Sequence, residues 1–243
     1  MNIGAIEKEA GYETARAMRE LLDRIRDVDD KHEKNVIIRK LDSLIVGNDR
    51  RGDYLEFSVD GIKMYGSAQG WQDLRVASSS IKASTTTPPD WGTFIGNINA
   101  WLFAGTGVNA EEVFFELQLP HGINTAEPLQ PHVHVAPMTS GGTGNIKFFM
   151  EYTLSDAGDA FPAATTVSGS LAVGAQYEHM IIGLDPGIDI SGVGDSAIIM
   201  GRVYRDPADA GDTYGNDVAL LSIDFHHVIE SFGSDDPIGD RPV

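Results

Sequence analysis

The sequence predicts a mainly β protein: an antiparallel jelly-roll sandwich preceded by an N-terminal helical segment and a β-hairpin. Three observations lead to this fold class. Apolar residues recur at helical spacing only near the N-terminus, and after Gly47 the spacing changes to two, the period of a half-buried strand. Beyond residue 91, short apolar stretches alternate with Gly-, Pro- and Asp-rich turns without helical segments between them, as in sandwiches and jelly rolls.

Residues 1–46 form the first predicted domain, a helical arm. Apolar side chains recur along it every three to four residues, while charged residues fill the other positions. Such a pair of helices cannot bury its apolar side alone. Two interpretations therefore stay open, an ordinary helical hairpin and an arm for attachment or oligomerisation. In the second, the interface positions are Leu21, Leu22, Ile25, Ile37 and Leu41.

Residues 47–90 form the second predicted segment, a β-hairpin followed by a linker. Apolar and polar residues alternate on both sides of Asp60-Gly61, a dipeptide typical of tight hairpin turns. Residues 78–92 are rich in Ser, Thr and Pro, which predicts a loop.

The third predicted domain, residues 91–243, is the jelly-roll sandwich. Its strands are expected at residues 97–104, 112–119, 132–137, 145–154, 163–173, 178–184, 196–205 and 218–230. In the last of these, the alternation places Leu221, Ile223, Phe225 and Ile229 on one face with His227 among them. Asp224 and His226 share the other face and could pair. The Asp-rich stretch 206–217 is interpreted as a turn-rich connection, since it lacks the spacing of an EF-hand.

Composition restricts the partners. The formal net charge is −18. Residues 76–243 carry five Lys and Arg against twenty-one Asp and Glu, a net charge of −16, which excludes nucleic-acid binding there and favours a basic protein surface as partner. No apolar stretch is long enough to cross a membrane, and no signal peptide is expected at the N-terminus. The absence of cysteine excludes thiolate sites and fits synthesis in a reducing cytoplasm.

Two histidines in the stretch QPHVHV are the candidate metal ligands. His132 and His134 share one strand face, and Val133 and Val135 point to the core. If this strand pairs with residues 112–119, Glu116 and Gln118 join the histidines in one polar patch, a candidate subunit interface.

A cupin-type site would place an acid a few residues after the histidines, whereas the next acid is Glu151. No cofactor is therefore predicted. A structural metal, for example on a trimer axis with one histidine from each subunit, stays open beside hydrogen-bonded surface or interface histidines.

Several motifs follow one another along residues 71–234. They are WQDLRV (71–76), PDWGTF (89–94), EEVFFELQLPHGIN (111–124), EPLQPHVHVAP (127–137), IKFFMEYTL (146–154), SAIIMGRVYRD (196–206) and DTYGNDVALLSIDFHHVIESFGS (212–234). Their order resembles a group of tailed-bacteriophage virion proteins with LPH, PHxHW, EYT, RxxR and DxHY motifs. Val135 and His227 depart from the Trp and Tyr usual in that group, and residues 1–46 lie outside the match.

The resemblance implies a jelly-roll domain in a capsid-decorating, head-fibre or tail-associated protein of the virion, without enzymatic activity. It implies a homotrimer whose partners are further copies and the major capsid or tail proteins. One alternative is a receptor- or carbohydrate-binding module that uses Trp71, Trp91 or Tyr214. Another is a cupin-like metalloenzyme.

Overall fold

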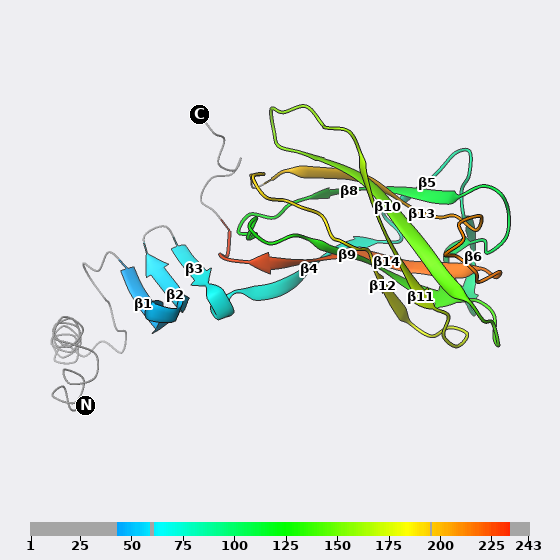
Figure 1. Cartoon of the computed structure of the whole chain (residues 1–243), viewed down its shortest axis with the longest axis horizontal. Coiled ribbons are helices and arrows are strands. Elements are labelled where there is room, and N and C mark those ends of the chain that lie inside the picture. The colour runs from blue at the N-terminus through cyan, green and yellow to red at the C-terminus, as the bar shows by residue number, and fades with distance from the viewer. Residues whose placement is uncertain (1–42, 59–60, 195, 234–243) are drawn as a thin grey trace. The chain divides into compact units, whose positions relative to one another are not determined.

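The computed structural model describes residues 43–58, 61–194 and 196–233 (Figure 1). The strands are β1 (Ser43–Asn48), β2 (Asp53–Ser58), β3 (Gly61–Tyr65), β4 (Gly70–Ala77), β5 (Lys82–Ala83), β6 (Asp90–Ile95), β7 (Ile98–Phe103), β8 (Glu111–Gln118), β9 (Gln130–Pro137), β10 (Asn145–Ser155), β11 (Thr165–Ala172), β12 (Met180–Gly183), β13 (Ile198–Arg205) and β14 (Val218–Ile229). Two 3-10 helices, η1 (Asp49–Arg51) and η2 (Gly66–Ala68), complete the described elements. Within the described ranges, no helix is long and apolar enough to span a membrane.

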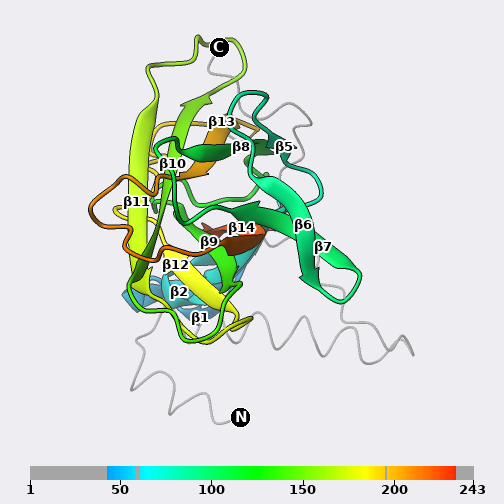
Figure 2. The ribbon, with the colours of Figure 1, turned by 90° about the vertical axis from the view of Figure 1, so that its right-hand side faces the viewer.

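Two antiparallel sheets form the sandwich. One has the strand order β11-β10-β13-β8-β5, and the other has the order β12-β9-β14-β7-β6 with β4 also paired to β14. Figure 2 shows β8, β10 and β13 on one side of the body and β9, β12 and β14 on the other.

The strand pairs identify a jelly roll. From the two ends inward, β7 pairs with β14, β8 with β13, β9 with β12 and β10 with β11. This nested pairing is what results when one long two-stranded ribbon is wound into two four-stranded sheets, the architecture of a jelly roll. The predicted fold class is confirmed for the described residues.

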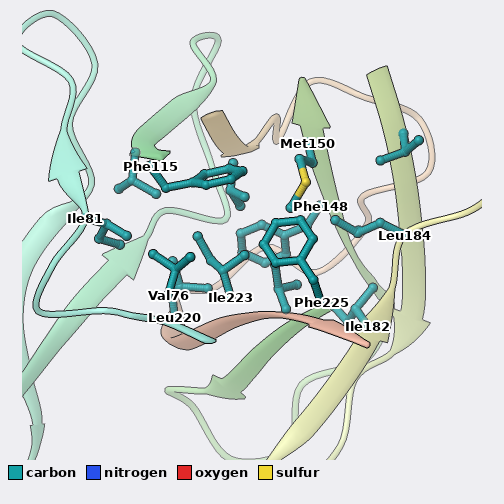
Figure 3. Packing of buried hydrophobic residues seen from close by; sticks show 14 of the residues in the cluster. Val76, Ile81, Phe115, Phe148, Met150, Ile182, Leu184, Leu220, Ile223 and Phe225 are labelled. Carbon is teal, nitrogen blue, oxygen red and sulfur yellow. The ribbon is translucent and has the colours of Figure 1, made fainter. Parts of the chain in front are cut away.

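The core lies between the two sheets, and aromatic side chains join them (Figure 3). The ring of Phe103 in β7 lies 5.3 Å from that of Phe148 in β10, and the ring of Phe115 in β8 lies 5.7 Å from that of Phe225 in β14. Edge-on and tilted arrangements at these separations are favourable for aromatic pairs. The alternation seen in the sequence places these residues inward because successive strand residues face opposite sides.

The N-terminal predictions are met only in part. The hairpin of β2 and β3 is confirmed, with Tyr54 opposite Tyr65 and their rings stacked. Residues 43–46, predicted as the end of the helical arm, instead begin β1, where Leu44-Ile45-Val46 supplies branched side chains that favour strands. The predicted interface positions Leu21, Leu22, Ile25, Ile37 and Leu41 lie outside the described residues.

The sandwich begins before the predicted boundary at residue 91. Strand β4, which falls in the predicted linker, pairs with β14 along its whole length, and β5 pairs with β8. The Ser/Thr/Pro-rich stretch is therefore a connection within the sandwich. One of its polar residues is tied to the sandwich by a hydrogen bond from the Ser84 hydroxyl to the Glu112 carboxylate at 3.0 Å.

Candidate functional site

Histidines and acids gather on the outer face of the six-stranded sheet. His132 and His134 of β9 point outward, while Val133 and Val135 are buried in the core, as the sequence predicts. The register of the sheet places Asp224 of β14 directly opposite His132. Strand β14 pairs with β9 along one edge and with β4 along the other. The polar residues of these three strands, which are far apart in the sequence, therefore lie side by side.

Short polar contacts connect this group. Nδ1 of His134 lies 2.6 Å from Nε2 of His179, and its Nε2 lies 3.4 Å from Oδ2 of Asp224. The Ser222 hydroxyl donates to Oδ1 of the same carboxylate. At the outer end of the group, Nε2 of His226 lies 2.7 Å from Oδ1 of Asp73. The pairing of Asp224 with His226 that the sequence allowed does not form, because Asp224 contacts His134 and Ser222 while His226 contacts Asp73.

The group surrounds an open hollow of about 430 Å³, here called the histidine hollow. It is lined by Asp73, Arg75, His134, His179, Leu221, Ser222 and Asp224. The carboxylate of Asp224 is only 6% exposed, whereas the Arg75 side chain 3.7 Å away is 69% exposed. The floor of the hollow is thus firmly packed, and the cation at its rim is free to move into solvent.

Burial sets the protonation of two histidines here. It lowers the pKa of His134, and the positive charge of neighbouring groups adds to this, while the Asp224 carboxylate opposes it. Burial also lowers the pKa of His227, which points into the core from β14. Both imidazoles are therefore biased toward the neutral form, in which a ring nitrogen keeps its lone pair.

A β-bulge changes which side chains line the histidine hollow. The register between β14 and β9 shifts between Leu220 and Ser222. The extra residue turns Leu221, predicted to share a face with Ile223 and Phe225, toward the hollow, and it puts Leu220 in the core instead. Beyond the bulge the predicted alternation holds, with Ile223, Phe225 and His227 buried.

The predicted polar patch of Glu116, Gln118, His132 and His134 is wrong. Glu116 and Gln118 are exposed on β8, which belongs to the five-stranded sheet, whereas the histidines lie on the six-stranded sheet. The chain crosses from the five-stranded sheet to the six-stranded sheet between β8 and β9. The outward faces of β8 and β9 consequently lie on opposite sides of the sandwich.

The outer face of the five-stranded sheet carries a second candidate surface, here called the aromatic face and defined by Phe114, Phe149, Tyr204 and Arg202. The rings of Phe149 and Tyr204 stack at 4.9 Å, and the Arg202 guanidinium lies 4.6 Å from the centre of the Tyr204 ring. Phe114 is 41% exposed. This surface was not predicted from the sequence, although the alternation of Phe114, Glu116 and Gln118 in one strand was a signal for it.

Hollows flank Phe114 on both sides. One, of about 290 Å³, is lined among others by Glu151, Met200 and Arg202. The other, of about 420 Å³, is lined among others by Lys82, Ser84 and Thr86. The aromatic ring thus stands between two sets of hydrogen-bonding groups.

Of the aromatic residues predicted for ligand binding, Trp71 and Trp91 are exposed, at 61% and 50%. The prediction for Tyr214 is wrong, since this side chain is 1% exposed. Tyr214, which belongs to the stretch 206–217, packs against the guanidinium of Arg205. The turn-rich interpretation of that stretch is confirmed, because its carboxylates hold the connection together: Asp206 accepts from a backbone N–H at Ala208 and Asp209 from Gly211.

Comparison with known proteins identifies no family. No protein-family model and no curated protein sequence matches this chain. Among solved structures, the chain is similar to a carbohydrate-binding module described for specific mannan recognition, with 14% identity and a TM-score of 0.34. That match covers 65% of this chain and 98% of the module.

Proposed function

We propose that this chain is a structural protein of a tailed-phage particle, a homotrimeric capsid decoration (cement) or head-fibre protein on the outside of the virion. It acts by binding further copies of itself and the major capsid or tail proteins, and it performs no catalysis. The proposal begins with the ordered motifs of residues 71–234, which resemble those of tailed-phage virion proteins.

The observation that carries the proposal is that these motifs contact one another. Glu151 of the EYT motif pairs with Arg202 of the RxxR motif at 2.6 Å, and Glu112, close to the LPH motif, pairs with the same guanidinium. The second arginine, Arg205, pairs with Asp212 of the last motif at 2.7 Å. Residues of four of the resembling motifs thus contact one another in two ion-paired groups, one around Arg202 and one around Arg205, which supports the proposal.

Surface chemistry supports a role in assembly. Lys147, Arg202 and Arg205 are all ion-paired with carboxylates of the sandwich itself, which leaves its outer surface predominantly acidic. Apolar side chains such as Ile98, Ile181 and Met200 are 66%, 51% and 44% exposed. An interface of about 1,600 Å² with apolar contacts at its centre and charges at its rim is stable without any chemistry.

The solution mass of the purified full-length chain tests the trimer. We expect sedimentation equilibrium at micromolar concentration to give three times the chain mass of 26.2 kDa. Leu21→Asp/Ile25→Asp in the predicted arm should reduce the mass to that of one chain. A monomeric wild-type protein would contradict the trimer. A density map of particles from the phage that encodes the chain tests the virion role. A map that shows no jelly roll on the particle surface would contradict it.

A second candidate function, glycan binding, is favoured by the aromatic face. Sugar rings stack on exposed aromatic rings while neighbouring polar groups bond their hydroxyls. Phe114 lies between two hollows that offer such groups. We expect glycan-array binding that falls at least about tenfold in Phe114→Ala, equivalent to about 1.4 kcal/mol. Phe57→Ala is the control because it removes a ring of similar exposure, 39% against 41%, from the separate three-stranded sheet that contains β2. Equal losses in both variants, or no array binding, would reject this candidate.

A further inference from the structure

His134 and Asp224, which line the histidine hollow, and His132 beside them have together the composition of a transition-metal site. His132, His134 and Asp224 each offer one nitrogen or oxygen atom, and these atoms all lie within 4.8 Å of one another. Two imidazoles with a carboxylate are suited to divalent zinc and its neighbours, whereas Ca²⁺ and Mg²⁺ prefer oxygen ligands alone. Within the described part of the chain, no other group of three such residues meets this distance.

The spacing of the central pair fits tetrahedral coordination. Ligand atoms about 2.0–2.1 Å from a tetrahedral metal lie roughly 3.3–3.4 Å from one another. Nε2 of His134 lies 3.4 Å from Oδ2 of Asp224. This nitrogen is buried and makes no hydrogen bond with any described residue, so the short separation is not explained by a hydrogen bond between the two.

Neighbouring groups orient all three ligands. Nδ1 of His134 contacts His179 at 2.6 Å, and Nδ1 of His132 lies 3.4 Å from the backbone carbonyl of Gln130. When each Nδ1 donates its proton to these acceptors, both Nε2 lone pairs remain for a metal. The Ser222 hydroxyl, bonded to Oδ1 of Asp224, leaves Oδ2 as the ligand. Metal-binding histidines and carboxylates are commonly fixed by hydrogen bonds of this kind.

The charges around the site allow a divalent ion. Asp224 supplies one negative charge, and Arg75, its present cationic neighbour at 3.7 Å, is largely exposed and displaceable. Asp73 and Ser222 also line the histidine hollow. Since the hollow is open, a fourth position remains for water or for a ligand from another molecule.

We propose that His132, His134 and Asp224 bind one divalent transition-metal ion of the Zn²⁺ class, which ties β9 to β14 at the outer face of the six-stranded sheet. All three ligands come from one chain, so the site needs no trimer axis. The proposal is independent of the proposed function, because its ligands and their supporting hydrogen bonds belong to the isolated sandwich.

Zinc titration of untagged, chelator-treated, full-length protein tests the site. We expect one equivalent of Zn²⁺ to bind by calorimetry. At a free Zn²⁺ concentration one hundred times the dissociation constant, the melting temperature should rise by about 5–10 °C. Co²⁺ should give the intense visible absorption of a tetrahedral complex. His134→Gln and Asp224→Asn should each weaken binding at least about a hundredfold and abolish the absorption.

His226→Gln is the matched control. Its ring lies 4.5 Å from that of His132 on the same sheet face, yet it is not one of the three ligands, so Zn²⁺ affinity should change less than about threefold. Circular dichroism of each metal-free variant separates lost ligands from lost fold. The proposal is overturned if the wild type binds no stoichiometric zinc, or if folded His134→Gln retains wild-type affinity.

Discussion

Replacing Arg205 with alanine is expected to lower the free energy of unfolding by about 3–5 kcal/mol, the usual cost of removing one member of a buried ion pair. Arg205 is fully buried. Its Nε and Nη2 atoms donate to the two oxygens of Asp212 at 2.7 and 2.9 Å. Three further bonds reach the backbone carbonyls of Phe103, Tyr214 and Asn216. All five N–H donors of the guanidinium are thereby used.

The alanine variant would leave the 7%-exposed residue Asp212 as an uncompensated buried charge, and three carbonyls would lose their donors. Because these carbonyls belong to β7 and to the stretch 206–217, the loss separates the end of one strand from the connection leading into β14. Arg205→Lys should recover only part of the stability, since an ammonium has three donors and cannot form the two-point contact with Asp212. Urea unfolding followed by tryptophan fluorescence measures both variants.

Arg202→Ala is the matched control for Arg205→Ala. Arg202 lies on the same strand and also pairs with two carboxylates, Glu112 and Glu151, but its side chain is 34% exposed. Solvent screens such pairs, so the expected loss is about 0–1 kcal/mol. Equal losses in the two arginine variants would show that burial of the Arg205 cluster contributes nothing to stability.

The strands of the jelly roll were predictable because inward and outward residues alternate along most of their length. In β9 and β10 each buried apolar residue is followed by a more exposed or polar one over most of the length. Such a pattern predicts which side of the sheet a residue faces, but it does not predict which strand pairs with the strand that carries the residue. The sequence therefore predicted the outward direction of His132 and His134 and placed Glu116 and Gln118 wrongly beside them.

Asp224, the third member of the histidine group, could not be assigned from spacing. It lies 90 residues beyond His134 in sequence, and only the pairing of β9 with β14 brings the two together. Leu221 was misplaced for a local reason, since a bulge adds one residue to β14 and reverses the alternation there. Long-range register and irregular strands thus limited the prediction of the site more than the identity of its residues did.

Gly169→Ala is expected to destabilise the protein by about 3 kcal/mol, the upper part of the range for overpacking, with a fall in melting temperature of roughly 6–12 °C. Gly169 of β11 faces the backbone of β12, where the two sheets meet at one edge. A Cβ at this position would collide with the carbonyl oxygen of Gly183. Because the obstacle is backbone, no change of side-chain rotamer relieves the collision, and β11 must move away from β12.

That movement breaks the link between the sheets next to the substitution. Ser168 and Asp185 exchange backbone hydrogen bonds of 3.4 and 3.1 Å, which join β11 to the residues after β12. Gly183→Ala is the matched control, since a Cβ at Gly183 meets no atom within 4 Å. It should change stability by less than about 1 kcal/mol, because alanine reduces the entropy of the unfolded chain without a collision. Similar melting temperatures for the two variants would contradict this prediction. They would mean that β11 and β12 can move apart at Gly169 without loss of stability.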